Sequence, residues 1–174
     1  MGLEAVRLLV LDHDGVLTDN HVYTNQHGEE MCRYYRGDGI GIERVKALGV
    51  RVVCLSSEAN PVVAARCLKL KLRCIQGSKN KLWDLGQEAG IEAIPLSGVA
   101  YVGNDVNDLE CLKAVGFPFV PQDCEKALRA SRYVGRDIEV SADILRFTRL
   151  IRKGGEGCVR EVCDLIADAK EAAR

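Results

Sequence analysis

The sequence predicts an α/β fold in which a doubly wound parallel sheet is covered by helices on both faces. Three observations support this class: β-branched runs alternate with helical patterns, the links between them are short, and no repeat or low-complexity segment interrupts them. Strands buried on both faces read as continuous apolar runs, and the runs at 6–11, 50–55 and 99–102 have that character.

The length of 174 residues suits one domain, so we expect a single domain over 1–174 with one sizeable core. The composition is 47% hydrophobic and 28% charged with a net charge of -1, so neither nucleic acid nor an anionic membrane is expected as a partner. The chain has no apolar run of 18 residues and no signal-peptide pattern, which favours a cytoplasmic protein.

Eight cysteines are present, and no C-x-x-C pair occurs among them. Several stand inside apolar segments, such as Cys54 and Cys111. We therefore predict buried, reduced thiols that act as small hydrophobes, in preference to a disulfide framework or a zinc site.

The elements of the first half follow from periodicity and turn residues. Strand 6–11 comes first, and Asn25 to Gly28 form the turn of a β-hairpin within 21–35. This hairpin, at about 20–35, is the one insertion in the alternating pattern, and it is expected over the carboxyl ends of the strands. The remaining elements are a helix over 38–48 that Gly49 ends, a strand over 50–55, a helix over 60–70 that Asn60-Pro61 opens, a strand over 73–75 and a helix over 80–89.

The second half continues the alternation and then ends in helices. The expected elements are a strand over 99–102, a helix over 108–115, a strand over 118–120, a short helix over 125–130, a strand over 133–134 and a helix over 141–152. Glycines at 154–157 break that helix, and a terminal helix over 159–170 follows.

Residues 12–19, directly after the first strand, carry the strongest functional signal. Asp12 and Asp14 stand at the carboxyl end of a strand, where open α/β sheets bind their ligands. The spacing suits phosphoryl transfer, because one carboxylate can attack phosphorus while the other handles a proton. Both are hard oxygen ligands that Mg²⁺ prefers, and the Thr18 hydroxyl can hold a phosphate oxygen. The structural alternative is an Asx-rich turn.

Three further features fall where this fold brings them next to Asp12. Ser56 and Ser57 follow the second parallel strand and offer a hydroxyl to a phosphate oxygen. Lys81 begins a helix and can neutralise a phosphoryl group and the attacking carboxylate. The loop 103–108 offers acidic and amide oxygens that can complete a Mg²⁺ site. Taken one at a time, these features are better explained as a helix cap, a solvated lysine and an Asx turn, so only their combination points to a site.

The order of these motifs resembles the haloacid-dehalogenase-like (HAD) superfamily of phosphohydrolases over essentially the whole chain. The motifs are Asp-x-Asp-Gly, then Ser, then Lys at a helix start, then Gly-Asn-Asp-x-x-Asp. The hairpin in place of a cap domain and the segments 36–42 and 153–157 are similar to one branch with a Rossmann-like fold. That branch holds 3-deoxy-octulosonate 8-phosphate phosphatases, sialic acid 9-phosphate phosphatases and phosphatase-like domains of acylneuraminate cytidylyltransferases.

The resemblance implies a role for each matching residue. Asp12 is implied as the nucleophile that forms an aspartyl-phosphate. Asp14 is implied as the group that protonates the leaving alkoxide and then activates water, with its backbone carbonyl on Mg²⁺. The other implied residues are Thr18, Ser56 and Lys81 at the phosphoryl group, and Asp12, Asn104, Asp105 and Asp108 at the metal.

Members of this branch are usually tetramers in which the hairpin and the C-terminal tail of one subunit cover the neighbouring site. The resemblance therefore implies a homotetramer, and it implies a substrate role for Gly155 and Glu156 in the tail at about 153–174. A flexible break between two helices is the alternative reading of these glycines.

Two positions depart from the pattern of the resemblance. Asn104 stands where many members carry Asp, so a neutral amide replaces one charged metal ligand. His13 stands where an apolar residue is common. Because strand side chains alternate, we expect His13 to point away from the two carboxylates and to be packed or hydrogen-bonded.

Glu58, Arg66 and Lys69 give a clue to the substrate. The two cations are three residues apart and share a helix face, and a Glu beside them suits a polyhydroxylated sugar with a carboxylate. With Ser57, they are the predicted substrate contacts, although a salt-bridged helix surface explains them too. The 9-phosphate phosphatases look similar here, so the preferred function is a Mg²⁺-dependent phosphatase for a nonulosonic, sialic-type acid 9-phosphate.

Three alternatives remain beside that function. The first keeps the chemistry and changes the substrate to octulosonate 8-phosphate. The second is an assembly partner for a cytidylyltransferase, which Asn104 favours and the intact Asp12 and Asp14 oppose. The third, a phosphorelay receiver domain, is disfavoured because its acceptor normally follows the third strand.

Overall fold

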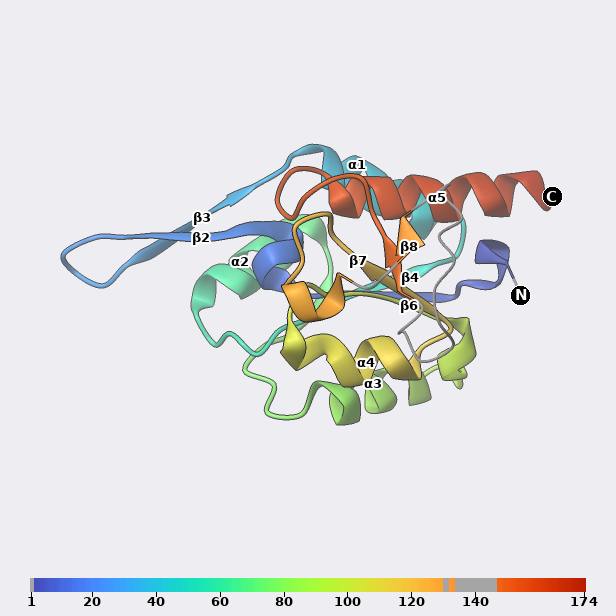
Figure 1. Ribbon diagram of the computed structural model, residues 1–174, viewed down its shortest axis with the longest axis horizontal. Helices are drawn as coiled ribbons and strands as arrows, with labels where there is room; N and C mark the ends of the chain where they lie inside the picture. The colour runs from blue at the N-terminus through green and yellow to red at the C-terminus, as the bar shows by residue number, and fades with distance from the viewer. Residues whose placement is uncertain (1, 130–131, 134–146) are drawn as a thin grey trace.

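Figure 1 shows the computed structural model, which describes residues 2–129, 132–133 and 147–174. A sheet with the strand order β5-β4-β1-β6-β7-β9-β8 lies at its centre, and every neighbouring pair is parallel. The predicted α/β class is thereby confirmed. The strands are β1 (Leu8–Leu11), β4 (Arg51–Leu55), β5 (Arg73–Ile75), β6 (Val99–Val102), β7 (Phe117–Val120), β8 (Arg132–Tyr133) and β9 (Thr148–Arg149).

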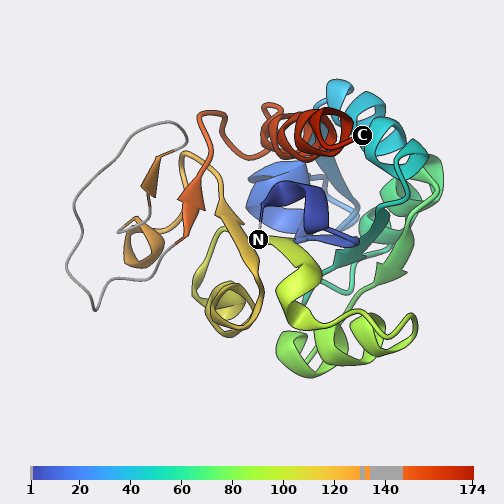
Figure 2. The same ribbon diagram turned by 90° about the vertical axis from the view of Figure 1, so that its right-hand side faces the viewer.

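Helices cover both faces of this sheet, as Figure 2 shows. Alternation along β1 divides the core, because Leu9 and Leu11 pack on one side while Leu8 and Val10 pack on the other. The first side is covered by α1 (Gly37–Ala47), α2 (Pro61–Leu70) and α5 (Cys158–Ala172), and the second by α3 (Lys81–Gly90) and α4 (Leu109–Ala114).

The hairpin of β2 (Thr18–Thr24) and β3 (Glu30–Tyr34) projects from the end of the molecule opposite the two termini (Figure 1). Its strands pair antiparallel, and its turn uses Asn25 and Gly28, with Gly28 at φ 76°. The predicted insertion is therefore confirmed. It leaves the body directly after β1 and its turn, so it stands beside the carboxyl ends of the parallel strands.

Local signals explain where two of the helices begin. Asn60 caps α2, because its side chain accepts a hydrogen bond from the amide of Val62 at 3.0 Å. The buried carboxylate of Asp38 in α1 accepts from the amide of Arg160 at 3.0 Å, in the first turn of α5. This bond ties the two helices together across 122 residues of sequence.

Several predicted elements differ from the structure. The helix expected over 108–115 divides into a 3-10 turn (Val106–Asp108) and α4, and the one expected over 125–130 is a 3-10 turn (Lys126–Leu128) in its described part. The helix expected over 141–152 is wrong where it can be compared, because β9 pairs there with β7 and β8. Its residues 141–146, and Val134 of the strand expected over 133–134, lie outside the described residues.

The cysteines are all free thiols, and six of the eight are buried. The expectation of buried thiols is confirmed for these six, while Cys32 and Cys74 are partly exposed. Across the described ranges, the helices are too short or too polar to cross a membrane.

Candidate active site

The chain turns sharply after β1, at the residues that the sequence singles out. Asp12 directly follows the strand, and residues His13–Leu17 form a wide turn in which Gly15 has a φ of 72°. A Cβ atom on Gly15 would overlap the side chain of Asn104, so only glycine allows this approach. The loop after β1 and the loop after β6 therefore meet at this point.

Lys81 lies between two buried carboxylates. Its Nζ is 3.0 Å from Oδ1 of Asp12 and 2.8 Å from Oδ1 of Asp108. The side chains of all three residues are at most 5% exposed. The first residue of α3 thus brings the only cation of this trio to the end of β1.

Asp108 organises the loop after β6. Its Oδ1 also accepts a hydrogen bond from the buried Tyr101 hydroxyl at 2.7 Å. Its Oδ2 accepts from the backbone amides of Asn104 at 2.9 Å and Asp105 at 3.3 Å. Both oxygens of Asp108 are thus engaged by Lys81, Tyr101 and its own loop, and Lys81 lies between Asp108 and Asp12.

The electrostatics of this trio leave an excess of negative charge. Burial and the charge of Asp108 raise the pKa of Asp12 well above its ordinary value, although Lys81 opposes the shift. Burial lowers the pKa of Lys81, but Asp12 and Asp108 outweigh it, and the net shift is upward. One buried cation therefore faces two buried carboxylates, which favours the binding of a further cation.

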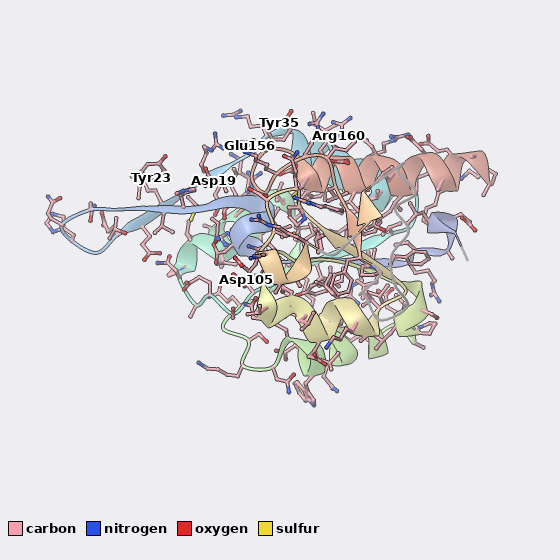
Figure 3. All side chains as sticks on the ribbon, in the orientation of Figure 1. Asp19, Tyr23, Tyr35, Asp105, Glu156 and Arg160 are labelled. Atoms are coloured by element: carbon pink, nitrogen blue, oxygen red, sulfur yellow. The ribbon has the colours of Figure 1, made fainter. Side chains whose placement is uncertain are left out.

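An open pocket of about 310 Å³ lies over the end of β1. Asp14 reaches it with a side chain that is 38% exposed, while Asp12 forms its floor with a nearly buried one. Figure 3 shows Asp105 toward the end of the body from which the hairpin projects. The lining residues are Asp12, Asp14, Asn20, Ser57, Asn104, Asp105, Val106 and Asn107.

The hydroxyl groups divide between the pocket and the backbone. Thr18 Oγ1 is buried and accepts from the amides of Gly15 and Asn20, both at 3.3 Å. Ser56 is also buried and accepts from the amide of Glu58 at 3.1 Å. Ser57 lines the pocket instead, so it is the predicted hydroxyl that the structure brings to the surface of the site.

Three of the predicted substrate residues, Glu58, Arg66 and Lys69, lie in two places. The carboxylate of Glu58 accepts from two backbone amides that follow it, both at 2.7 Å. Arg66 and Lys69 line a second pocket, of about 650 Å³, between α1 and α2. Within one chain, these two cations therefore do not line the pocket of Asp12.

The glycine-rich loop before α5 packs against the turn after β1. The amide of Gly155 donates to the carbonyl of Val16 at 3.0 Å. Glu156 pairs with Arg33 of the hairpin at 3.1 Å, and Arg33 also binds Asp19 at 2.8 Å. Figure 3 shows Glu156 and Asp19 on the same side of the molecule, at the base of the hairpin.

His13 corrects one expectation. Its side chain is buried and hydrogen-bonded, as expected, but Nδ1 lies 2.9 Å from Oδ1 of Asp14, so the ring does not point away from both carboxylates. The reason is local: the chain leaves the extended conformation after Asp12, so strand alternation no longer applies.

Sequence reasoning also missed Asn20, Tyr101 and Asn107. Asn20 lines the pocket but falls outside the motifs, and no sequence signal separates it from an ordinary surface amide. Asn107 lines the pocket too, at an unspecified position of the motif after β6. Tyr101 had a signal, because a tyrosine inside a buried strand needs a partner for its hydroxyl.

The donor set fits Mg²⁺ when backbone and amide oxygens are counted. Among the described residues, no group of three or more acidic, His or Cys side chains is placed to hold a metal. However, Asp12, Asn104 and Asp105 line one pocket with Asp14, so carboxylate, amide and carbonyl oxygens are at hand. The side chain of Asn104 also lies against the turn that carries these residues, at Gly15.

A parallel sheet whose central strand ends in Asp-x-Asp, with a buried Lys on the first Asp, defines a HAD-type phosphohydrolase. Comparison with known proteins agrees. The 3-deoxy-D-manno-octulosonate 8-phosphate phosphatase KdsC of Escherichia coli K12 is 35% identical over 164 residues, which cover 94% of this chain and 80% of that protein. The chain therefore belongs to the KdsC-like family of HAD phosphatases.

Two solved structures are also similar to this chain. The phosphatase of the same description from Yersinia pestis superposes with a TM-score of 0.85 at 27% identity, covering 97% of this chain and 84% of that one. The Moraxella catarrhalis enzyme, in complex with magnesium, phosphate and KDO, gives 0.82 at 28% identity, covering 97% and 90%.

N-acylneuraminate cytidylyltransferase A of Danio rerio is 32% identical over 98% of this chain. The match covers 37% of that longer protein. No family model matches the chain.

Proposed function

We propose that this protein is a Mg²⁺-dependent phosphatase that releases phosphate from a sugar-acid phosphate through an aspartyl-phosphate on Asp12. One observation carries the proposal: Asp12 and Asp14 line the same pocket, and Lys81 forms an ion pair with Asp12, with Nζ 3.0 Å from Oδ1. A nucleophile, a proton-transfer group and a fixed cation are the parts that this reaction needs.

In the first half of the reaction, a carboxylate oxygen of Asp12 attacks phosphorus while the bond to the sugar oxygen breaks. Asp14, protonated at that stage, gives its proton to the leaving alkoxide. Lys81 keeps Asp12 in place and offsets its charge as the phosphoryl group approaches.

In the second half, Asp14 takes a proton from water as the water oxygen attacks phosphorus, and the bond to Asp12 breaks. Asp108 holds Lys81 and the amides of Asn104 and Asp105 throughout, so its role is to fix the geometry of the loop. Ser57, at the edge of the pocket, is placed to donate to a phosphate oxygen.

Mg²⁺, when bound, supplies positive charge to the phosphate oxygens. We assign its ligands to the Asp12 carboxylate, the Asp14 backbone carbonyl and an oxygen of Asn104 or Asp105. The arrangement of two buried carboxylates around one cation, Lys81, supports this assignment. So does the magnesium named with the Moraxella catarrhalis relative.

Two substrates compete for the pocket. The octulosonate 8-phosphate is favoured by the names of the relatives that match along 94% of the chain. The nonulosonic acid 9-phosphate is favoured by Glu58, which stands one residue after Ser57 of the pocket, and by the match to the acylneuraminate cytidylyltransferase. Arg66 and Lys69 would serve that substrate only from a neighbouring chain, because their pocket is separate.

Phosphate release from both sugar-acid phosphates, with Mg²⁺ and with chelator, tests the proposal. We expect turnover of one of them that needs Mg²⁺ and is lost in Asp12→Asn, with Asp168→Asn, at an exposed side chain of α5, as the matched control. Mass spectrometry of the protein quenched in acid should detect the phosphoryl group on Asp12. Equal rates with chelator, or in the Asp12 variant, would overturn it.

A weakly catalytic assembly partner of a cytidylyltransferase is the other candidate that an observation favours. Asn104 removes one charge from the metal loop, which lowers the attraction for Mg²⁺. If this candidate is right, neither substrate is turned over faster than in Asp12→Asn, and Asn104→Asp raises Mg²⁺-dependent phosphate release.

A further inference from the structure

His13 is fully buried, and both of its ring nitrogens have a partner. Nδ1 lies 2.9 Å from Oδ1 of Asp14, and Nε2 lies 3.0 Å from the hydroxyl of Tyr34 in β3. The residue between the two catalytic carboxylates therefore links one of them to the base of the hairpin. An apolar residue at this position would make neither contact.

The direction of these two hydrogen bonds follows from the donors available. Burial raises the pKa of Tyr34, so its phenol keeps the proton and donates it. The nearer acceptor is Nε2 of His13 at 3.0 Å, since the carbonyl of Val62 is 3.5 Å away. A neutral imidazole that accepts at Nε2 carries its proton on Nδ1, so His13 donates to Asp14.

The imidazole is also fixed from the side. Its ring meets the ring of Tyr34 edge-on, with centroids 5.7 Å apart and an angle of 62° between the planes. The guanidinium of Arg66 lies over the Tyr34 ring, 4.6 Å from its centroid. The same guanidinium donates a hydrogen bond to the carbonyl of Tyr35 at 3.3 Å. A ring that is buried, clamped and bonded at both nitrogens holds its partner in one orientation.

We propose that His13 is a positioning residue for Asp14: its Nδ1–H binds Oδ1, so that the proton exchanged with the substrate is carried on Oδ2. This inference rests on the proposed function, because it needs Asp14 as the group that transfers the proton. It goes further by assigning an orienting role to the residue between the two carboxylates.

The consequence concerns the first chemical step. As the Asp12 oxygen bonds to phosphorus and the ester bond breaks, the leaving oxygen takes the Oδ2 proton of Asp14. Rotation of an unrestrained carboxyl group would often present the unprotonated oxygen to the substrate. Esters of alcohols need this proton, since an alkoxide is a poor leaving group, whereas 4-nitrophenolate leaves as a stable anion without it.

The dependence on the leaving group separates positioning from damage to the fold. We compare kcat/KM for a sugar-acid phosphate and for 4-nitrophenyl phosphate, because this ratio reports the steps up to phosphoryl transfer. In His13→Leu, we expect a loss of ~10–100-fold with the sugar-acid ester and less than ~3-fold with the aryl ester. His13→Asn, whose amide N–H can replace Nδ1–H, should recover most of the loss.

Two further variants support the comparison. Tyr34→Phe removes the hydroxyl on Nε2 but keeps the aromatic ring, and we expect a loss of ~3–10-fold that is again confined to the sugar-acid ester. His27→Leu, in the exposed turn of the hairpin, is the matched control and should change neither value.

Equal losses with both esters, or no loss with the sugar-acid ester, would overturn the positioning role and leave the proposed function standing. Failure of the wild-type protein to hydrolyse either ester with Mg²⁺ would overturn the proposed function, and the inference with it.

Discussion

Lys81 is the residue on which the charge balance of the site depends. It is the cation of a buried trio, and its removal would leave Asp12 and Asp108 side by side without compensation. Breaking a buried ion pair by removing one partner costs about 3–5 kcal/mol, so Lys81→Met should lower the free energy of unfolding by that order. Urea unfolding at neutral pH with chelator measures it.

The second carboxylate provides the control for this prediction. In the double variant Lys81→Met with Asp108→Asn, one of the two unpaired charges is gone, so we expect part of the lost stability to return. A loss below ~1 kcal/mol in the single variant would mean that water reaches the trio and screens it.

Asp38 makes stability depend on pH in the direction opposite to most carboxylates. Burial raises its pKa from 3.8 to about 6, although the amide of Arg160 opposes the shift. The folded state thus binds the proton more tightly than the unfolded state. The contribution of Asp38 is most favourable below pH 4, declines as the pH rises to about 6 and is constant above that value.

Asp38→Asn should remove this dependence and keep an oxygen for the amide of Arg160. The stability of the wild type relative to the variant should fall by about 2–3 kcal/mol between pH 4 and pH 7, as measured by urea unfolding at each pH. Asp164→Asn serves as the opposite control, because hydrogen bonds from Arg160 and Arg44 outweigh burial and lower the pKa of Asp164. A flat difference for Asp38 would contradict the prediction.

The glycine-rich loop before α5 and the turn after β1 meet without room for a side chain. A Cβ atom on Gly154 would overlap the carbonyl oxygen of Gly15, in the turn that carries Asp14. Gly154→Ala should therefore lower the free energy of unfolding by about 1–3 kcal/mol and displace the turn, with a loss of phosphatase activity.

Gly86 offers the matched substitution in the same protein. It lies on the exposed side of α3, and a Cβ atom there would meet nothing within 4 Å. Gly86→Ala should raise the free energy of unfolding by about 0.5–1 kcal/mol, because alanine favours the helix. Thermal unfolding and phosphatase assays of both variants would show whether only the loop substitution is harmful.

The elements that the sequence predicted well have strong local signals. The strand over 99–102 and the strand over 73–75 match their predicted bounds, and the helix that Asn60-Pro61 opens begins where the cap places it. The strand at Thr148–Arg149 was missed because its pairing is entirely non-local. It lies between β7 and β8, and two residues are too few to show a period.

For the site, the sequence predicted which motifs meet, but it did not predict the directions of their side chains. Asp12 and Lys81 form the predicted pair. The sequence could predict it because Asp12 follows a recognisable strand and Lys81 begins a recognisable helix. The direction of the His13 side chain, back toward Asp14, depends on the wide turn at His13–Leu17. That turn has no sequence pattern beyond Gly15, so its side-chain directions needed the structure.

At the scale of the whole molecule, the hairpin exposes apolar side chains far from the core. Figure 3 shows Tyr23 out on the hairpin, beyond the body of the molecule. Tyr23 is paired with Met31 across the two strands, and these side chains are 60% and 63% exposed. Val22 is 52% exposed. A two-stranded ribbon is marginally stable alone, so such a surface favours contact with a partner.

We expect that partner to be further copies of the same chain, in the tetramer that the family resemblance implies. Size-exclusion chromatography coupled to light scattering should give a mass near four times 19.1 kDa. Charges at an apolar contact are costly to bury, so Tyr23→Lys with Met31→Lys should reduce this mass without unfolding the body. Trp83→Lys, at a side chain of similar exposure on α3, should leave the mass unchanged. A wild-type mass near 19.1 kDa would show that the hairpin stands alone and must be stabilised by its own ion pairs at Arg33.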